Sequence, residues 1–68
     1  MTPTQRQTQV LDAILFLADD RGFPPTIREV AARLKTLPSN VHQILSRLRA
    51  IGLVDWEDGK LRTLRVVK

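Results

Sequence analysis

Apolar residues recur every three or four positions in the first part of the chain, a spacing typical of amphipathic helices. The first helix is predicted over about residues 5–19. Its apolar face consists of Val10, Ala13, Ile14, Leu17 and Ala18, widened by Leu11, Leu15 and Phe16. Two capping boxes compete for its start, Thr2 with Gln5 and Thr4 with Gln7, because each pairs a hydroxyl with an amide three residues later.

A second, shorter helix is predicted over about residues 27–35. Its apolar stripe consists of Ile27, Val30, Ala31 and Leu34. About nine residues is below the roughly 12–15 at which an isolated helix is even marginal in water, so this helix needs a rigid start, a cap and a packing partner. Pro24 and Pro25 restrict the backbone in front of it, and Thr26 forms a capping box with Glu29.

A third helix is predicted over about residues 38–51, and Pro38 is suited to its first turn. Its apolar stripe consists of Val41, Ile44, Leu45, Leu48 and Ile51. Only three or four residues separate this helix from the previous one. Two short helices joined by a tight turn predict a helix-turn-helix.

A β-hairpin is predicted over about residues 53–67. Asp58 and Gly59 lie between two runs of alternating apolar residues, which is the strongest short-range signal for a hairpin. The whole chain is therefore predicted to form a single α+β domain over residues 1–68. This fold is a small winged helix-turn-helix, with three helices followed by a two-stranded antiparallel β-hairpin wing.

The composition is that of an ordinary soluble domain, with 43% hydrophobic and 26% charged residues in a chain of 68. Cysteine is absent, which excludes disulfides and cysteine-based metal sites. No apolar run reaches the roughly 20 residues that cross a bilayer, and no signal peptide is visible. We therefore expect a cytoplasmic, nucleoid-associated protein without membrane contact, and no small-molecule ligand is evident.

The net charge of +4 comes from the second half of the chain. Residues 1–34 contain four basic and four acidic side chains, whereas residues 35–68 contain seven basic and three acidic ones. Such asymmetry favours a polyanionic partner. By itself the charge does not decide the question, because many small soluble proteins are basic without such a role.

The polar face of the third predicted helix is the candidate site. The side chains suited to reading base edges are Ser39, Asn40, His42, Gln43 and Ser46. Asn and Gln have the paired donor and acceptor that suit adenine, and His can donate to a guanine acceptor. Arg47 and Arg49 follow where phosphates flank the major groove. The simpler alternative is a solvated helix face, but the helix-turn-helix context and the basic half favour contact with double-stranded DNA.

The wing is a second candidate for DNA contact. Lys60, Arg62 and Arg65 are suited to lie along phosphates or the minor groove, with contact expected mainly through Lys60 and Arg62. Three carboxylates near the wing tip oppose such contact, namely Asp55, Glu57 and Asp58. Trp56 is predicted to pack beside the core rather than to stack on a base.

Catalytic and metal-binding residues are not evident. His42 is the only histidine, and Ser39 and Ser46 have no plausible base to activate them. A lone histidine with scattered carboxylates does not make a metal site, and the three glycines do not form a phosphate-binding loop. We therefore expect no enzymatic activity, no metal and no cofactor.

Four segments together resemble the N-terminal DNA-binding domain of the LexA family, the repressors of the bacterial SOS response. They are "TQRQTQVLDAI" (Thr4 to Ile14), "RGFPPTIREVAARL" (Arg21 to Leu34), "PSNVHQIL" with its Val41-His42 pair, and "GLVDWEDGKLRTLRVV". The segments cover nearly the entire chain in the same order. The resemblance implies an operator-binding winged helix whose third helix lies in the major groove. It also implies base contacts from Ser39, Asn40, His42 and Gln43, with Arg28 and the wing near phosphates.

The chain departs from the family pattern between the second and third helices. The turn there is one residue shorter than usual, and Lys35 stands where the family often has glycine, which bears on the docking angle. Family members continue into a second domain that dimerises and cleaves itself, whereas this sequence stops at Lys68. We expect either an excised domain or a free-standing regulator, for example of phage or plasmid type. We also expect it to bind paired half-sites as a homodimer, because a single module binds DNA weakly.

A protein-interaction module is the alternative function for the same fold. Such a module would hold a regulator or a polymerase subunit instead of DNA. The acidic wing tip supports this alternative, as do four apolar residues that are candidates for exposure, Leu11, Leu15, Phe16 and Leu37. Retention on heparin that depends steeply on salt would favour the DNA-binding function over it.

Overall fold

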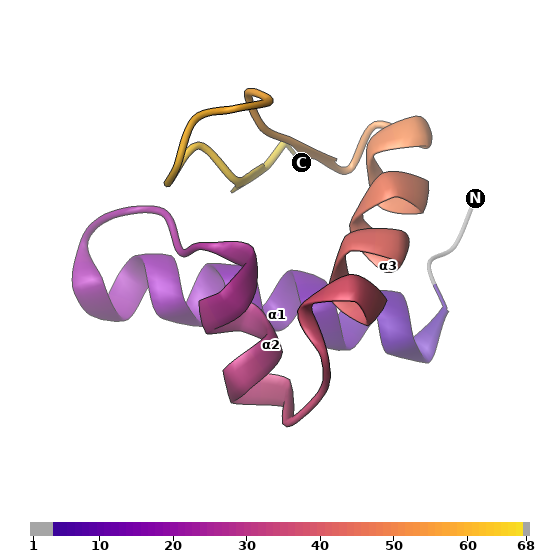
Figure 1. Ribbon diagram of the computed structural model, residues 1–68, viewed down its shortest axis with the longest axis horizontal. Coiled ribbons are helices and arrows are strands. Elements are labelled where there is room, and N and C mark those ends of the chain that lie inside the picture. The colour runs from indigo at the N-terminus through magenta and orange to yellow at the C-terminus, as the bar shows by residue number, and fades with distance from the viewer. Residues whose placement is uncertain (1–3, 68) are drawn as a thin grey trace.

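The computed structural model describes residues 4–67 and confirms the predicted winged helix-turn-helix. Within that range the chain forms three helices and then a two-stranded antiparallel sheet (Figure 1). The elements in chain order are α1 (Gln5–Arg21), α2 (Ile27–Leu34), α3 (Pro38–Ala50), β1 (Val54–Asp55) and β2 (Arg65–Val66). The predicted helix boundaries agree with these to within two residues.

The capping box at Thr4 starts α1. The Thr4 hydroxyl accepts the N–H of Gln7 at 3.1 Å, and the Gln7 side-chain oxygen accepts the N–H of Thr4 at 2.9 Å. The competing box at Thr2 lies outside the described residues. At its other end α1 runs two residues beyond the predicted limit to Arg21, because nothing breaks the helix before Gly22. Gly22 ends it in the left-handed conformation, at φ 80°.

The second capping box starts α2 as predicted. The Thr26 hydroxyl accepts the Glu29 N–H at 3.1 Å, and the Glu29 carboxylate accepts the Thr26 N–H at 2.8 Å. Pro25, directly before the cap, is fully buried, so the rigid segment is also part of the packing. The helix ends at Leu34, one residue earlier than predicted, because Lys35 takes the left-handed conformation at φ 55°.

The core lies where the three helices meet the sheet. Its buried residues are Val10, Ala13, Ile14, Leu17, Val30, Ala31, Val41, Leu45, Leu48, Val54 and Leu64. Every helix contributes part of its predicted apolar stripe, and the two sides of the hairpin contribute Val54 and Leu64. The hydrophobic effect is roughly proportional to the apolar area removed from water, so this cluster is the main stabilising element of the domain.

Three apolar side chains that the helical spacing assigned to buried faces lie outside the core, and two of them, Leu15 and Phe16, are also among the predicted candidates for exposure. Leu15 is 53% exposed and Phe16 49% exposed, because α2, α3 and the wing cover only the narrower face of α1. Ile51 was assigned to the buried stripe of α3 but is 38% exposed. The helix ends at Ala50, so Ile51 no longer follows the helical spacing that would direct it inward.

The wing has a short ladder and a long loop. Among the described residues the ladder pairs Val54 with Val66 and Asp55 with Arg65. The predicted turn at Asp58-Gly59 is present, with Gly59 at φ 78°, but the strands do not extend to it. The chain between the strands is shaped by side chains instead, as described below.

None of the helices described between residues 4 and 67 has the length and apolar character needed to span a bilayer.

Candidate nucleic-acid interface

The polar side of α3 is open to solvent. The predicted base-edge residues are all exposed, namely Ser39, Asn40, His42, Gln43 and Ser46. They stay outside because Val41, Leu45 and Leu48, on the opposite side of the same helix, are each fully buried. The core therefore fixes the rotation of α3 about its own axis, and the polar side is presented without cover from another part of the described chain.

Two side chains at the start of α3 are oriented by neighbours. The Asn40 amide donates to the Thr36 hydroxyl at 3.1 Å, which turns Asn40 toward the helix-turn-helix corner. The His42 ring lies 6.0 Å from the Trp56 ring, centroid to centroid, with an interplanar angle of 64°. This edge-to-face geometry is favourable for aromatic pairs. This contact connects the first half of α3 to the wing.

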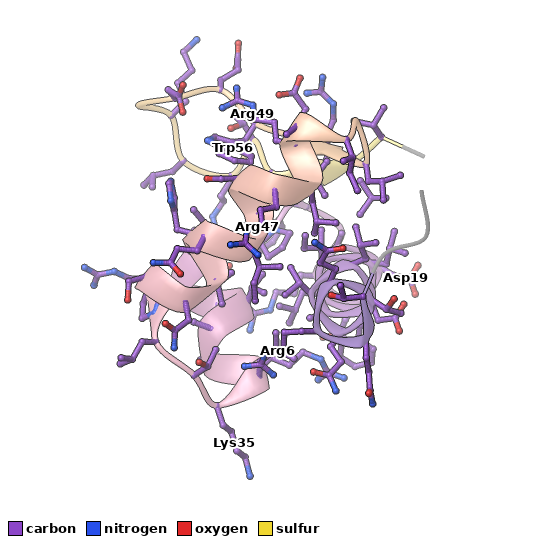
Figure 2. All side chains as sticks on the ribbon, turned by 90° about the vertical axis from the view of Figure 1, so that its right-hand side faces the viewer. Arg6, Asp19, Lys35, Arg47, Arg49 and Trp56 are labelled. Atoms are coloured by element: carbon purple, nitrogen blue, oxygen red, sulfur yellow. The ribbon has the colours of Figure 1, made fainter. Side chains whose placement is uncertain are left out.

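The two arginines at the end of α3 have different environments (Figure 2). Arg47 is exposed and lies on the open side of the helix. Arg49 turns to the wing, where its guanidinium lies 4.2 Å from the centroid of the Trp56 ring and donates to the Trp56 carbonyl at 2.8 Å. It also pairs with Asp55 at 3.2 Å and with Asp58 at 3.6 Å. Arg49 therefore joins α3 to the wing.

Asp55 completes this connection. Its carboxylate accepts the N–H of Trp56 at 2.9 Å and lies between Arg49 and Arg65. The hydrogen bond from Trp56 lowers the pKa of Asp55, and the two arginines lower it further. Trp56 itself packs against the core and donates its indole N–H to Asp58 at 2.9 Å, which confirms that it supports the fold.

An open cavity of about 520 Å³ separates the wing loop from the start of α2. Its lining is mostly apolar, and three basic side chains also line it, namely Arg28, Lys60 and Arg62. Arg28 and Lys60 are exposed, and within residues 4–67 neither forms an ion pair. Arg62 differs, because it forms an ion pair with Glu29 at 3.1 Å.

Two residues were missed in the sequence. Glu29 was assigned only a capping role, yet it also binds Arg21 and Arg62. No local pattern indicates the second contact, because 33 residues separate the partners. Leu61 is 84% exposed at the wing loop. The sequence could have indicated this exposed side chain, because Leu61 lies between Lys60 and Arg62 directly after the turn at Asp58-Gly59.

The charge on Glu29 is strongly stabilised. The N–H of Thr26 is the largest cause, followed by the guanidinium of Arg62 and the charge of Arg21, and together they lower the pKa of Glu29 to about 2. The carboxylate is therefore ionised in the whole neutral range, and it neutralises much of the positive charge of its two arginine partners.

No group of three or more histidine, aspartate or glutamate side chains is placed to hold a metal ion in the described part of the chain. The serines of α3 are exposed, and the one histidine contacts tryptophan rather than a serine hydroxyl. The exposed surface around α3 presents hydrogen-bonding groups and positive charge, which are the chemical requirements for contact with a nucleic acid.

The family model for the LexA DNA binding domain matches residues 1–63. The chain is similar to the "Transcription regulator LexA" of Synechocystis sp., with 38% identity over 66 residues that cover 94% of this chain and 32% of that protein. It is also similar to the "LexA repressor" of Thermotoga petrophila, with 37% identity over 65 residues that cover 96% of this chain and 33% of that protein. For the "LexA repressor" of Lactobacillus helveticus the identity is 40% over 62 residues, or 90% of this chain and 30% of the relative. The chain thus spans about a third of the length of these relatives.

Proposed function

Because this chain belongs to the family of LexA DNA-binding domains, we propose that it binds double-stranded DNA sequence-specifically as the operator-reading module of a transcriptional repressor. The relatives that carry the name LexA repressor support the regulatory part of this proposal. The main observation in support of this proposal is that the polar side of α3 is exposed. It lies opposite the fully buried side chains of Val41, Leu45 and Leu48, in the second helix of a helix-turn-helix. A helix of this kind enters the major groove and presents its first turns to base edges.

Base reading is assigned to five side chains of α3, namely Ser39, Asn40, His42, Gln43 and Ser46. Gln43 is the strongest candidate, because it is exposed in the middle of the helix and can bond both polar groups of an adenine. The contact between Asn40 and Thr36 sets the direction of the Asn40 amide before DNA binds. Such preorganisation lowers the entropic cost of association.

Phosphate contacts are assigned to Arg28, Arg47 and Lys60, which are exposed cations from α2, α3 and the wing. Arg49 and Arg62 carry the right charge, but carboxylates already hold their guanidinium groups. Transfer of either arginine to a phosphate would break these ion pairs. We therefore assign both arginines a supporting role in the wing.

Selection from a random duplex library, followed by sequencing, tests the proposal. A single module buries only about 600–1,000 Å² on DNA, so we expect weak binding by a monomer and tighter binding of two copies to paired half-sites. The expected result is an enriched inverted repeat. Recovery of random sequence after several rounds would contradict sequence-specific binding.

A protein-interaction role is the second candidate, and a specific observation favours it. Leu37 in the helix-turn-helix corner is 65% exposed, and Leu15 and Phe16 are exposed on α1. Elution from heparin separates the two functions, because phosphate contacts make retention depend steeply on salt. Retention that barely changes as salt rises would favour the protein partner.

A further inference from the structure

The carboxylate of Glu29 joins three parts of the molecule. One oxygen accepts from Arg21, at the end of α1, at 2.6 Å. The two oxygens accept separate N–H groups of Arg62, in the wing loop, at 3.1 Å and 3.3 Å. Glu29 itself stands in the first turn of α2 and caps it through Thr26. The bidentate arrangement with Arg62 is the stronger geometry for a guanidinium and a carboxylate.

Arg62 is held from more than one side. Besides Glu29, its guanidinium donates to the carbonyl of Pro24 at 3.2 Å and lies 4.7 Å from the centroid of the Phe23 ring. Its backbone has φ 60°, a left-handed conformation that residues other than glycine rarely adopt. A strained conformation persists only where the surroundings fix it, and here the fixing contacts come from the loop before α2 and from α2 itself.

These contacts hold the wing loop on the side of α2, as the contacts of Arg49 with Trp56 and Asp58 hold it on the side of α3. The ladder between β1 and β2 ends at Asp55 and Arg65, so backbone pairing does not reach the loop residues between them. Thr63 shapes the loop from within by accepting the N–H of Glu57 at 2.8 Å. Arg62 is the loop residue that attaches it to α2, and the loop runs beside the segment joining α1 to α2 (Figure 1).

We propose that Arg62 is a positioning residue, which together with Glu29 holds the wing loop over the start of α2 before DNA arrives. The pair places Lys60 beside Arg28 across the cavity that both side chains line, so that the two cations meet one stretch of phosphate backbone. This inference rests on the proposed DNA-binding function, and it replaces the direct phosphate contact of Arg62 predicted from the sequence.

The two roles of Arg62 make opposite predictions for Glu29. If Arg62 bound phosphate, Glu29 would compete with the DNA, and removal of its negative charge would tighten binding. If the pair positions the wing, removal of the charge releases the loop and weakens binding, although one repulsive carboxylate has gone. The sign of the change separates the two roles.

Glu29→Gln is a suitable variant because the chain already shows that glutamine can cap. Gln7 occupies the corresponding position in α1, and its side-chain oxygen accepts the N–H of Thr4. We therefore expect Glu29→Gln to keep the cap on Thr26 and the start of α2. What it loses is the charge that holds Arg21 and Arg62.

The experiment measures the Kd for the duplex enriched by library selection, using fluorescence anisotropy with wild type, Glu29→Gln, Arg62→Gln and the double variant. We expect each single variant to bind about 5- to 10-fold more weakly. This is the combined effect of losing one networked ion pair and of having to order one more loop side chain on binding. The double variant should bind no more weakly than either single variant, because both break the same contact. Tighter or unchanged binding by Glu29→Gln would overturn the inference.

Two variants serve as matched controls. Arg65→Gln removes one positive charge from the same hairpin, and Arg21→Gln removes the other partner of Glu29 without touching Arg62. We expect both to stay within about twofold of wild type, as is usual for exposed ion pairs. A loss equal to that of Arg62→Gln in either control would show that charge alone, and not position, causes the effect.

A measurement without DNA keeps the inference separate from the proposed function. Amide hydrogen exchange of residues 57–63 should be faster in Glu29→Gln and Arg62→Gln than in wild type, while residues 41–48 of α3 keep their protection. Unchanged exchange in the loop would overturn the positioning role even if DNA binding fell. A wild-type protein that enriches no duplex would instead overturn the proposed function, and the exchange data would still decide whether the pair holds the loop.

Discussion

Lys35 adopts a backbone conformation that lowers the free energy of unfolding of the domain. It ends α2 in the left-handed conformation and projects from the helix-turn-helix corner (Figure 2). For a residue with a Cβ this conformation costs roughly 1–2 kcal/mol, which glycine avoids. Part of the cost is offset, because a cation near a helix C-terminus contributes about 0.3–1 kcal/mol and glycine loses more entropy on folding.

Lys35→Gly should therefore raise the free energy of unfolding by about 0.5 kcal/mol, or Tm by about 2–4 °C for a domain of this size. Thermal unfolding followed by circular dichroism checks the shift. Lys35→Ala is the matched control, because it removes the charge but keeps the left-handed strain, so it should not stabilise the protein. A fall in Tm for Lys35→Gly would mean that the charge outweighs the strain.

Gln43 and Arg47 lie one helical turn apart on the open side of α3 but have different proposed roles. Gln43→Ala should cost about 1–3 kcal/mol of binding free energy at one base position and leave other positions unaffected. Arg47→Ala should weaken binding to all DNA sequences alike and reduce the slope of log K against log salt by about one. Competition with single-base variants of the selected duplex checks both. Equal losses on every duplex for Gln43→Ala would remove it from the base-reading set.

At the scale of elements, the helix starts and the presence of the hairpin were predictable, but the contacts that hold the wing loop were not. Thr4, Thr26 and Pro38 are local signals that act within one turn, and each marks the start of a helix in the structure. The loop of the wing is held by Arg49 and Arg62, whose partners belong to other parts of the sequence or to the loop itself. Such contacts arise only after the helices have packed, so a local pattern does not reveal them.

The same limit applies to the candidate site. The exposure of Ser39, Gln43 and Arg47 could be predicted because helical periodicity places them opposite the buried stripe of α3. The pairing of Arg49 and Arg62 with carboxylates could not. Charge counts treat all cations of the basic half alike, whereas in the described structure some of them form ion pairs and others do not.

The junction between α2 and the wing should make stability depend on acid. The pKa of Glu29 is lowered from 4.5 to about 2 in the folded protein, so the stabilising charge is fully present above about pH 4.5 and is lost as the pH falls toward 2. Asp55, whose pKa is also lowered, acts in the same direction. Tm should be flat above about pH 5 and fall below it. In Glu29→Gln the fall should be shallower, and an identical pH profile in the variant would show that the negative charge of Glu29 contributes nothing to stability.

At the scale of the whole molecule, the count of 11 basic side chains overstates the positive charge offered to DNA, because several of them are paired with carboxylates of the same chain. Arg49 and Arg62 stiffen the wing, while Arg28, Arg47 and Lys60 remain at the surface around α2, α3 and the wing loop. A wing that Arg49 and Arg62 already hold in place leaves less of the loop to be ordered on binding.

The salt dependence of DNA binding measures how many of these cations contact phosphates. Each phosphate contact contributes about −0.9 to the slope of log K against log salt, so three contacts per domain predict a slope of roughly −3, and two copies on an inverted repeat predict roughly −5 to −6. If Arg49 and Arg62 also bound phosphates, five contacts would give roughly −4 to −5 per domain. Anisotropy titrations between about 50 and 200 mM salt separate the two values. A duplex with one half-site gives the slope for one domain. The slope on the full inverted repeat should then be twice as large, since two copies of the same surface release twice as many counterions.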